Sequence, residues 1–130
     1  MENKVFTVSN ERFNDLINYI EDNLCEEISY KKLAKILGVN EYTMHRIFLF
    51  VTNYTVAEYI RKRRLSMSAL DLIDGNEKII DIAIKYGYDS PQAFSRAFKT
   101  MMGFLPSKID RNKNNIKYDF IRKFKDFLLK

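Results

Sequence analysis

The feature that most constrains the fold of this chain is an internal repeat. Residues 33–40 and 82–90 share an apolar residue, an Ala, a Gly four residues later and then a polar residue, with one extra residue after the second Gly. Further along, Arg46 and Phe48 both recur fifty positions later. Repeats of this length indicate one supersecondary unit used twice. A short helix, a turn at Gly and a second capped helix is the helix-turn-helix layout.

Apolar residues recur at helical spacing along nearly the whole chain. Its 130 residues include only four Gly and two Pro, too few for the many turns of a sandwich or barrel. We expect an all-α, homeodomain-like fold with two helix-turn-helix subdomains of three-helix type, joined by a long linker helix. The expected parts are an N-terminal extension at 1–9, a bipartite domain at 10–111 (first helix-turn-helix about 29–53, linker helix about 55–73, second helix-turn-helix about 78–103) and a tail at 112–130.

Local signals predict where the helices begin and end. Gly38 and Gly87 stand where a helix must stop, so we expect a positive φ at both. The expected N-terminal caps are Ser29, Asn40, Thr55 (in a capping box with Glu58) and Ser90. Spacing predicts that the first helix covers about 10–24 and that the second helices of the two units turn these residues inward: Met44, Ile47, Phe48 and Val51, then Phe94, Ala97, Phe98 and Met101.

The second helix of each unit then presents polar residues outward from its first two turns. Arg binds guanine O6 and N7 with two hydrogen bonds, Gln does the same for adenine, and His and Ser bind base edges or phosphates. Two such helices favour DNA binding over a plain helical bundle. The candidate base contacts are Tyr42, His45 and Arg46 in the first unit, and Gln92, Ser95 and Arg96 in the second.

The segment between the units has the length of a spacer. From Thr55 to about Ile73 a helix would span about 27 Å, and successive major-groove segments on one DNA face lie about 34 Å apart. With some lateral offset, two units joined in this way would read adjacent grooves as a monomer. Because the two outward faces differ, the site would be asymmetric and about 20 base pairs long.

The formal net charge of +5 is unevenly distributed. Residues 1–40 carry −2, residues 41–110 carry +2 and residues 111–130 carry +5. Phosphate contacts are expected from helix N-termini and from basic side chains. The candidates are Asn40, Arg61, Arg63, Ser90, Lys99 and Lys108. The basic tail is also amphipathic, and either packs back on the domain or leads into a further domain of a longer chain.

Catalysis and metal chemistry find little support. One Cys and one His cannot form an ordinary zinc site, and the phosphate-loop, dinucleotide, zinc-protease and hydrolase motifs do not occur. Cys25 is followed by two Glu residues, which do not favour a thiolate. We expect a protein that is not an enzyme, needs no cofactor or metal, and is cytoplasmic and nucleoid-associated rather than bound to a membrane.

Residues from about 10 to 111 resemble the DNA-binding domain of the AraC/XylS family of bacterial transcription regulators. The resemblance is carried in the second half by Arg64-Leu65, Ala69, Leu72-Ile73, Ile82-Ala83, Tyr86-Gly87-Tyr88, Ser90, Phe94-Ser95-Arg96-Ala97-Phe98-Lys99, Gly103 and Pro106-Ser107, and in the first by Leu33-Ala34, Met44-His45-Arg46-Ile47-Phe48 and Tyr59-Ile60-Arg61. It implies seven helices, helices in the major groove that begin near Glu41 and Pro91, and Ala93 as a further residue facing the bases. Small members of the family act as monomers that contact RNA polymerase, which implies an activator.

Some positions depart from the family pattern. Asn53 stands where Gly is frequent, so we expect the first of these helices to end differently from the second. Pro91 and Ala93 stand where close relatives are polar, and Ile109-Asp110-Arg111 replaces an aromatic residue followed by Arg. The alternative function is therefore a protein-interaction module of the same fold with little specific DNA binding.

Overall fold

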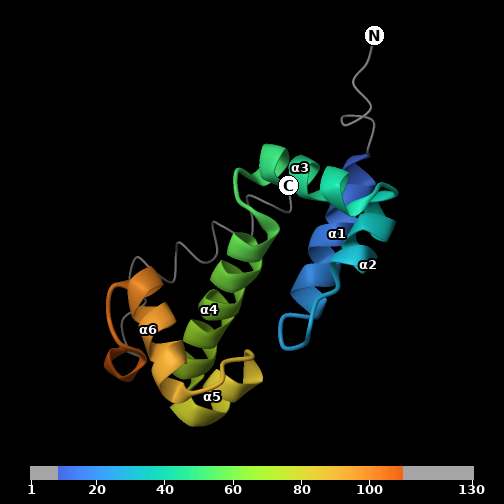
Figure 1. Ribbon diagram of the computed structural model, residues 1–130. Helices are drawn as coiled ribbons and strands as arrows, with labels where there is room; N and C mark the ends of the chain where they lie inside the picture. Colours follow the sequence, from blue (N-terminus) through green and yellow to red (C-terminus); the bar gives the residue numbers. More distant parts are fainter. Residues whose placement is uncertain (1–8, 110–130) are drawn as a thin grey trace. The chain divides into compact units, whose positions relative to one another are not determined.

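The computed structural model of the protein describes residues 9–109, and within that range all helices and turns form an all-α structure without strands (Figure 1). The predicted fold class is confirmed. Residues 1–8 and 110–130 lie outside the described residues, and with them all of the predicted extension at 1–9 except Ser9, the last two residues of the predicted domain and the whole predicted tail at 112–130. The described helices are α1 (Asn10–Asp22), α2 (Tyr30–Leu37), α3 (Glu41–Thr52), α4 (Val56–Asp74), α5 (Ile79–Lys85), α6 (Pro91–Met102) and the 3-10 turn η2 (Pro106–Lys108).

The described residues form two compact units, whose boundary falls inside α4 after Ile60. In the first unit, residues 9–60, α1 packs on α2 and α2 packs on α3. The apolar stripe of α1 is buried, and Phe48 of α3 packs between Phe13 and Tyr59, with ring centroids 5.8 and 5.5 Å away. The first turn of α4 completes this core. Its main buried residues are Leu16, Ile17, Ile20, Leu33, Leu37, Met44, Ile47, Phe48, Val56 and Tyr59.

In the second unit, residues 61–109, α4 supplies the helix on which α5 and α6 pack. Phe94 and Phe98 of α6 are fully buried and adjoin each other, and Phe104 closes against Phe98 at 5.8 Å. The core also includes apolar residues one helical turn apart on α4. Its buried members are Leu65, Ala69, Leu72, Ile82, Ala83, Tyr86, Phe94, Phe98 and Met102.

The repeat seen in the sequence is also a repeat of the backbone. Helices α3 and α6 each have 12 residues and start fifty positions apart, at Glu41 and Pro91. Each begins in the same way: Asn40 Oδ1 accepts a hydrogen bond from the Thr43 amide at 2.8 Å, and Ser90 Oγ accepts one from the Ala93 amide at 3.0 Å. The predicted caps are confirmed at both positions.

The turns before these helices match as well. Gly38 has φ +77° and Gly87 has φ +86°, so the predicted left-handed conformation is confirmed at both. In each turn the residue after Gly donates its amide back to the Ala carbonyl five residues earlier, from Val39 at 3.1 Å and from Tyr88 at 3.0 Å. This is the bond that closes a helix in the Schellman motif.

Helix α4 starts with the predicted capping box. The Thr55 amide donates to Glu58 Oε1 at 2.9 Å, and the Glu58 amide donates to Thr55 Oγ1 at 3.0 Å. Two amides that the helix itself leaves unpaired are thereby satisfied. The helix continues for 19 residues, which corresponds to about 28 Å.

Several sequence predictions need correction. Val51 is 49 % exposed rather than inward, because the buried stripe of α3 ends with Phe48 and Thr52. Ala97 and Met101 are only partly buried. The first helix ends at Asp22, although Leu24 beyond it is buried. The second helices end alike, because Asn53 takes φ +65° and donates its amide to the Leu49 carbonyl, as Gly103 does to Lys99, both at 2.8 Å.

Candidate nucleic-acid interface

The N-terminal cap of α3 sets where the helix begins, and its core residues set which side of the helix faces inward. Met44, Ile47 and Phe48 are buried, so the opposite side of the helix faces outward. Thr52 is buried too, and its hydroxyl donates to the Phe48 carbonyl at 2.8 Å, which satisfies that polar group. The outward side carries Tyr42, which is 70 % exposed.

The predicted base contacts of the first unit lie together on this side. The guanidinium carbon of Arg46, which is exposed, lies 5.7 Å from the ring centroid of Tyr42, within the range of a cation–π contact. His45 is half-buried because its ring meets Tyr30 edge to face, with centroids 4.8 Å apart. Tyr30, the first residue of α2, was not predicted from the sequence, since the contact joins two helices and no local pattern marks it.

Helix α6 repeats this arrangement in the second unit. Phe94, Phe98 and Met102 are buried on one side. Gln92 and Arg96, one helical turn apart, are exposed on the other, while Ala93 and Ser95 are half-buried at its edge. The structure therefore brings the predicted base contacts of each unit together on one helix face. These side chains are exposed or half-buried, and contact with base edges requires such access from outside.

Most predicted phosphate contacts are accessible. Arg61, Lys99, Lys108 and Asn40 are exposed, and Ser90 is half-buried. Asn40 and Ser90 hold the N-termini of α3 and α6, where the amides and the helix dipole attract anions.

Arg63 is a correction to the predicted phosphate contacts. Its side chain is only 1 % exposed, and Nη2 lies 3.6 Å from the sulfur of Met67. Tyr59 and Ser66, one turn before and one turn after it, are buried too, so Arg63 lies on the inward face of α4. The four consecutive basic residues at 61–64 suggest a helix face exposed to solvent. Successive side chains of a helix point in different directions, however, and Arg63 is the one that points inward. Arg63 cannot reach a phosphate from this position.

Tyr88, in the turn of the second unit, is influenced by two cations of α4. Tyr88 lies half-buried between α5 and α6, with its ring 5.5 Å from that of Phe94. Burial raises the pKa of the Tyr88 hydroxyl, and the charges of Arg61 and Arg64 oppose that rise. The charges of these two arginines of α4 therefore act on the Tyr88 hydroxyl.

Two classes of site find no support within residues 9–109. No cluster of three or more His, Cys, Asp or Glu side chains in this range could hold a metal ion. A separate survey of the helices in the same range finds none that is both long and apolar enough to cross a membrane.

The fold and the paired outward faces define a helix-turn-helix protein, and comparisons with known proteins identify its family. A family profile described as "Helix-turn-helix domain" matches residues 33–112. The HTH-type transcriptional activator AarP of Providencia stuartii is 36 % identical over 93 residues, which cover 72 % of this chain and 69 % of AarP. The regulatory protein SoxS of Escherichia coli K12 is 37 % identical over 93 residues, 72 % of this chain and 87 % of SoxS.

Among solved structures, the DNA-binding domain of the global transcriptional factor AdpA, determined in complex with a target DNA, has the same fold. It matches with a TM-score of 0.64 at 20 % identity, over 74 % of this chain and 86 % of that one. The chain belongs to the AraC family of helix-turn-helix transcription regulators.

Proposed function

We propose that this chain is a sequence-specific DNA-binding transcription regulator that inserts α3 and α6 into two adjacent major-groove segments. The observation that carries the proposal is the pair of equally long, equally capped helices, fifty residues apart, each with exposed groups suited to base edges. Two helices that only pack in a bundle would not require an exposed arginine at the same position in each helix.

The proposed division of roles follows from chemistry and accessibility. Base contacts come from Tyr42, His45 and Arg46 of α3 and from Gln92, Ala93, Ser95 and Arg96 of α6. Phosphate contacts come from Asn40, Arg61, Ser90, Lys99 and Lys108. Because the two faces differ, the site is asymmetric and about 20 base pairs long, and one protein molecule occupies it.

The biological setting of the proposal is activation of transcription in the cytoplasm, on the nucleoid. AarP is named as a transcriptional activator, which supports the same role here, with RNA polymerase as the protein partner. The protein acts by binding and not by catalysis, and needs no cofactor or metal.

The test is in vitro selection of bound oligonucleotides, followed by binding measurements on the preferred site. Arg46→Ala and Arg96→Ala should each cost about 1–3 kcal/mol on that site and relax the preference at one base position. Lys35→Ala, which removes an exposed cation from α2, is the matched control. If Arg46→Ala and Arg96→Ala lost equal affinity on random DNA, base contact by these residues would be refuted.

Phosphate contacts have a separate signature. Lys99→Ala and Lys108→Ala should weaken binding to all sequences alike, and each should lower the slope of log affinity against log salt by about 0.9. An unchanged slope would exclude that lysine as a phosphate contact.

A second candidate is a protein-interaction module of the same fold. It is favoured by Ile80 and Ile84, one helical turn apart on α5, which are 49 % and 65 % exposed. Such a module would produce only weak retardation of DNA in a gel-shift assay, with no dependence on sequence.

A further inference from the structure

The imidazole of His45, on the outward side of α3, has an aromatic neighbour on another helix. Its ring meets that of Tyr30 with an interplanar angle of 82° and centroids 4.8 Å apart. Aromatic rings prefer this edge-to-face geometry, because the positive edge of one ring attracts the negative face of the other. The contact links the first residue of α2 to the second turn of α3.

The caps of the two helices set the positions of both rings. Ser29 Oγ accepts a hydrogen bond from the Lys32 amide at 3.2 Å, which fixes the start of α2 and with it the backbone of Tyr30. Asn40 fixes the start of α3 in the same way, five residues before His45. Since α2 also packs on α3, the ring contact follows from the fold of the first unit.

The second unit shows that this fold does not require an aromatic pair. The residue matched to Tyr30 is Ile79, the first residue of α5, which packs against the core of the second unit. The residue matched to His45 is Ser95. In the first unit Tyr30 is 37 % exposed and His45 is half-buried, so neither ring belongs to the core. The pair is a feature of the outward surface rather than of the scaffold.

A histidine that contacts a base benefits from such a neighbour. Its ring turns about two side-chain torsions, and fixing them on binding costs affinity. A ring that already rests against another side chain has lost part of this freedom before DNA arrives. Contact groups that are held by packing also discriminate better than groups that adapt to several positions.

We propose that Tyr30 is a positioning residue, whose ring holds the imidazole of His45 in the orientation that contacts one base in the half of the site occupied by α3. This inference rests on the proposed function and adds a residue of α2 to sequence recognition. Tyr30 acts through His45, so the loss of its ring should matter only while His45 is present.

The first measurement follows the ring of His45 directly. It is the only histidine of the chain, so its carbon-bound ring protons can be assigned without ambiguity in a proton NMR spectrum of the whole protein. A neighbouring aromatic ring shifts these signals. Tyr30→Ile, which copies Ile79 of the second unit, should move them toward the positions of a free histidine. Tyr30→Phe keeps the ring and should leave them close to their wild-type positions.

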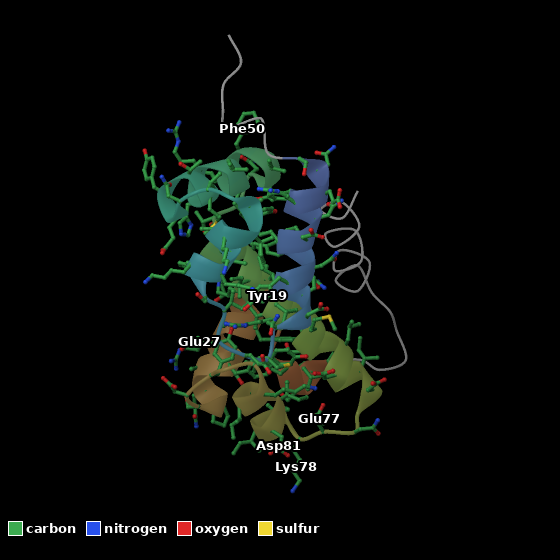
Figure 2. The ribbon with its side chains drawn as sticks, turned by 90° about the vertical axis from the view of Figure 1, so that its right-hand side faces the viewer. Tyr19, Glu27, Phe50, Glu77, Lys78 and Asp81 are labelled. Carbon is green, nitrogen blue, oxygen red and sulfur yellow. The ribbon has the colours of Figure 1, made fainter. Side chains whose placement is uncertain are left out.

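A second tyrosine supplies the matched control for this spectrum. Tyr19 lies on α1 (Figure 2), and its ring centroid is 6.0 Å from Nζ of Lys32 on α2. Tyr19→Ile therefore removes a tyrosine ring from the same unit, but not the one that meets His45. The signals of His45 should stay unchanged in this variant. Helix content measured by circular dichroism verifies that all variants fold.

The second measurement is a double-mutant cycle on the selected site. His45→Ala identifies the base that His45 contacts, as the position whose preference relaxes. Tyr30→Ile should relax the preference at the same position and lower affinity for the site about two- to tenfold, and Tyr30→Phe should bind like wild type. In the His45→Ala background, Tyr30→Ile should cost nothing further, because the two residues act as one unit.

The possible failures are distinguishable. Signals of His45 that Tyr30→Ile does not move, or an unchanged base preference in that variant, overturn the positioning role and leave the proposed function intact. Equal losses from Tyr30→Ile with and without His45, or an equal loss from Tyr30→Phe, assign Tyr30 a DNA contact of its own and overturn it too. A selected site at which His45→Ala relaxes no position does the same. A wild-type protein that selects no sequence overturns both proposals.

Discussion

The two helix-turn-helix units share a backbone and differ in surface. Helices α3 and α6 have the same length, and their N-terminal and C-terminal caps lie fifty residues apart. Yet residues 9–60 carry a formal charge of −3 and residues 61–109 carry +4. The comparison teaches that caps, turns and core fix the scaffold, while the outward residues are free to diverge.

The two units also differ in which part of the chain supplies the third helix. In the first unit α1 covers α2, whereas in the second the residues of α4 from Leu65 to Leu72 pack with α5 and α6. Each unit is a three-helix core of about fifty residues. Domains of this size bury a modest fraction of their surface, so single core residues should count heavily.

The largest expected effect comes from the matched core residues Phe48 and Phe98. Both are fully buried between other rings. Replacing either by Ala should cost about 3–5 kcal/mol in the free energy of unfolding, from lost burial and the cavity left behind. Urea titrations followed by amide signals from each unit measure it, with Phe→Leu at the same positions as milder controls.

The distribution of that loss tests the division into two units. If each unit holds its own core, Phe48→Ala should lower mainly the stability of residues 9–60, and Phe98→Ala that of residues 61–109. Equal losses in both halves for either variant would show one cooperative core and contradict the division.

The turn glycines give the next largest effect, and here the two units should differ. Both positions have a left-handed backbone, which costs an L-residue about 1–2 kcal/mol. A Cβ at Gly87 meets nothing, but one at Gly38 meets Nη1 of Arg12, which donates to the Leu37 carbonyl at 3.3 Å. Gly38→Ala should therefore cost about 1 kcal/mol more than Gly87→Ala, through loss of this bond.

Thermal unfolding of the two Gly→Ala variants measures this difference. The variant Arg12→Ala supplies the control, because it removes the side chain that the new methyl group would displace. In that background the two Gly→Ala costs should converge. A difference that persisted would locate its cause in the backbone of the turn.

Local features of the fold could be predicted from the sequence, since each depends on residues within about five positions. The capping box at Thr55 and Glu58 and the left-handed Gly38 and Gly87 belong to this class. The prediction that α3 ends differently from α6 was wrong, because Asn53 in place of Gly does not change how the helix ends. Asn also tolerates the left-handed conformation.

Features that depend on packing between helices could not be predicted in this way. The charged run around Arg63 looks solvated when read locally, yet α4 turns that one side chain inward. The contact between Tyr30 and His45 joins two helices. For the candidate site, the sequence predicted which residues share a face, but not which neighbour holds His45.

The matched helix caps should give smaller and equal effects. Asn40→Ala and Ser90→Ala each remove an oxygen that accepts from the third amide of its helix. Each should cost about 1 kcal/mol in the free energy of unfolding. Chemical denaturation measures both, and Asn40→Ser, which keeps an acceptor, should cost much less. Losses that differed by several-fold would break the equivalence of α3 and α6.

The smallest expected effect belongs to a charge network in the second unit. The ammonium of Lys85 donates to Asp71 Oδ2 at 3.0 Å and to Glu77 Oε1 at 3.1 Å, and the Tyr86 hydroxyl donates to the same Asp71 oxygen at 2.7 Å. The hydrogen bond to Asp71, helped by Glu77 against partial burial, raises the pKa of Lys85 above its ordinary 10.5. Because this lysine is about one-third exposed, the pair should contribute only about 0.5 kcal/mol.

The pH dependence of that contribution follows from the direction of the shift. The folded protein holds the Lys85 proton more tightly than the unfolded chain, so the stabilisation is complete below the ordinary pKa and disappears as pH rises through the folded value. Asp71→Asn keeps an acceptor for Tyr86 and removes the charge. The difference in unfolding free energy between wild type and Asp71→Asn should therefore stay constant from pH 7 to about pH 9.5 and shrink above about pH 10.5. Glu77→Gln should show a weaker version of the same trend, and a difference that did not change with pH would attribute the effect of Asp71 to the Tyr86 hydrogen bond alone.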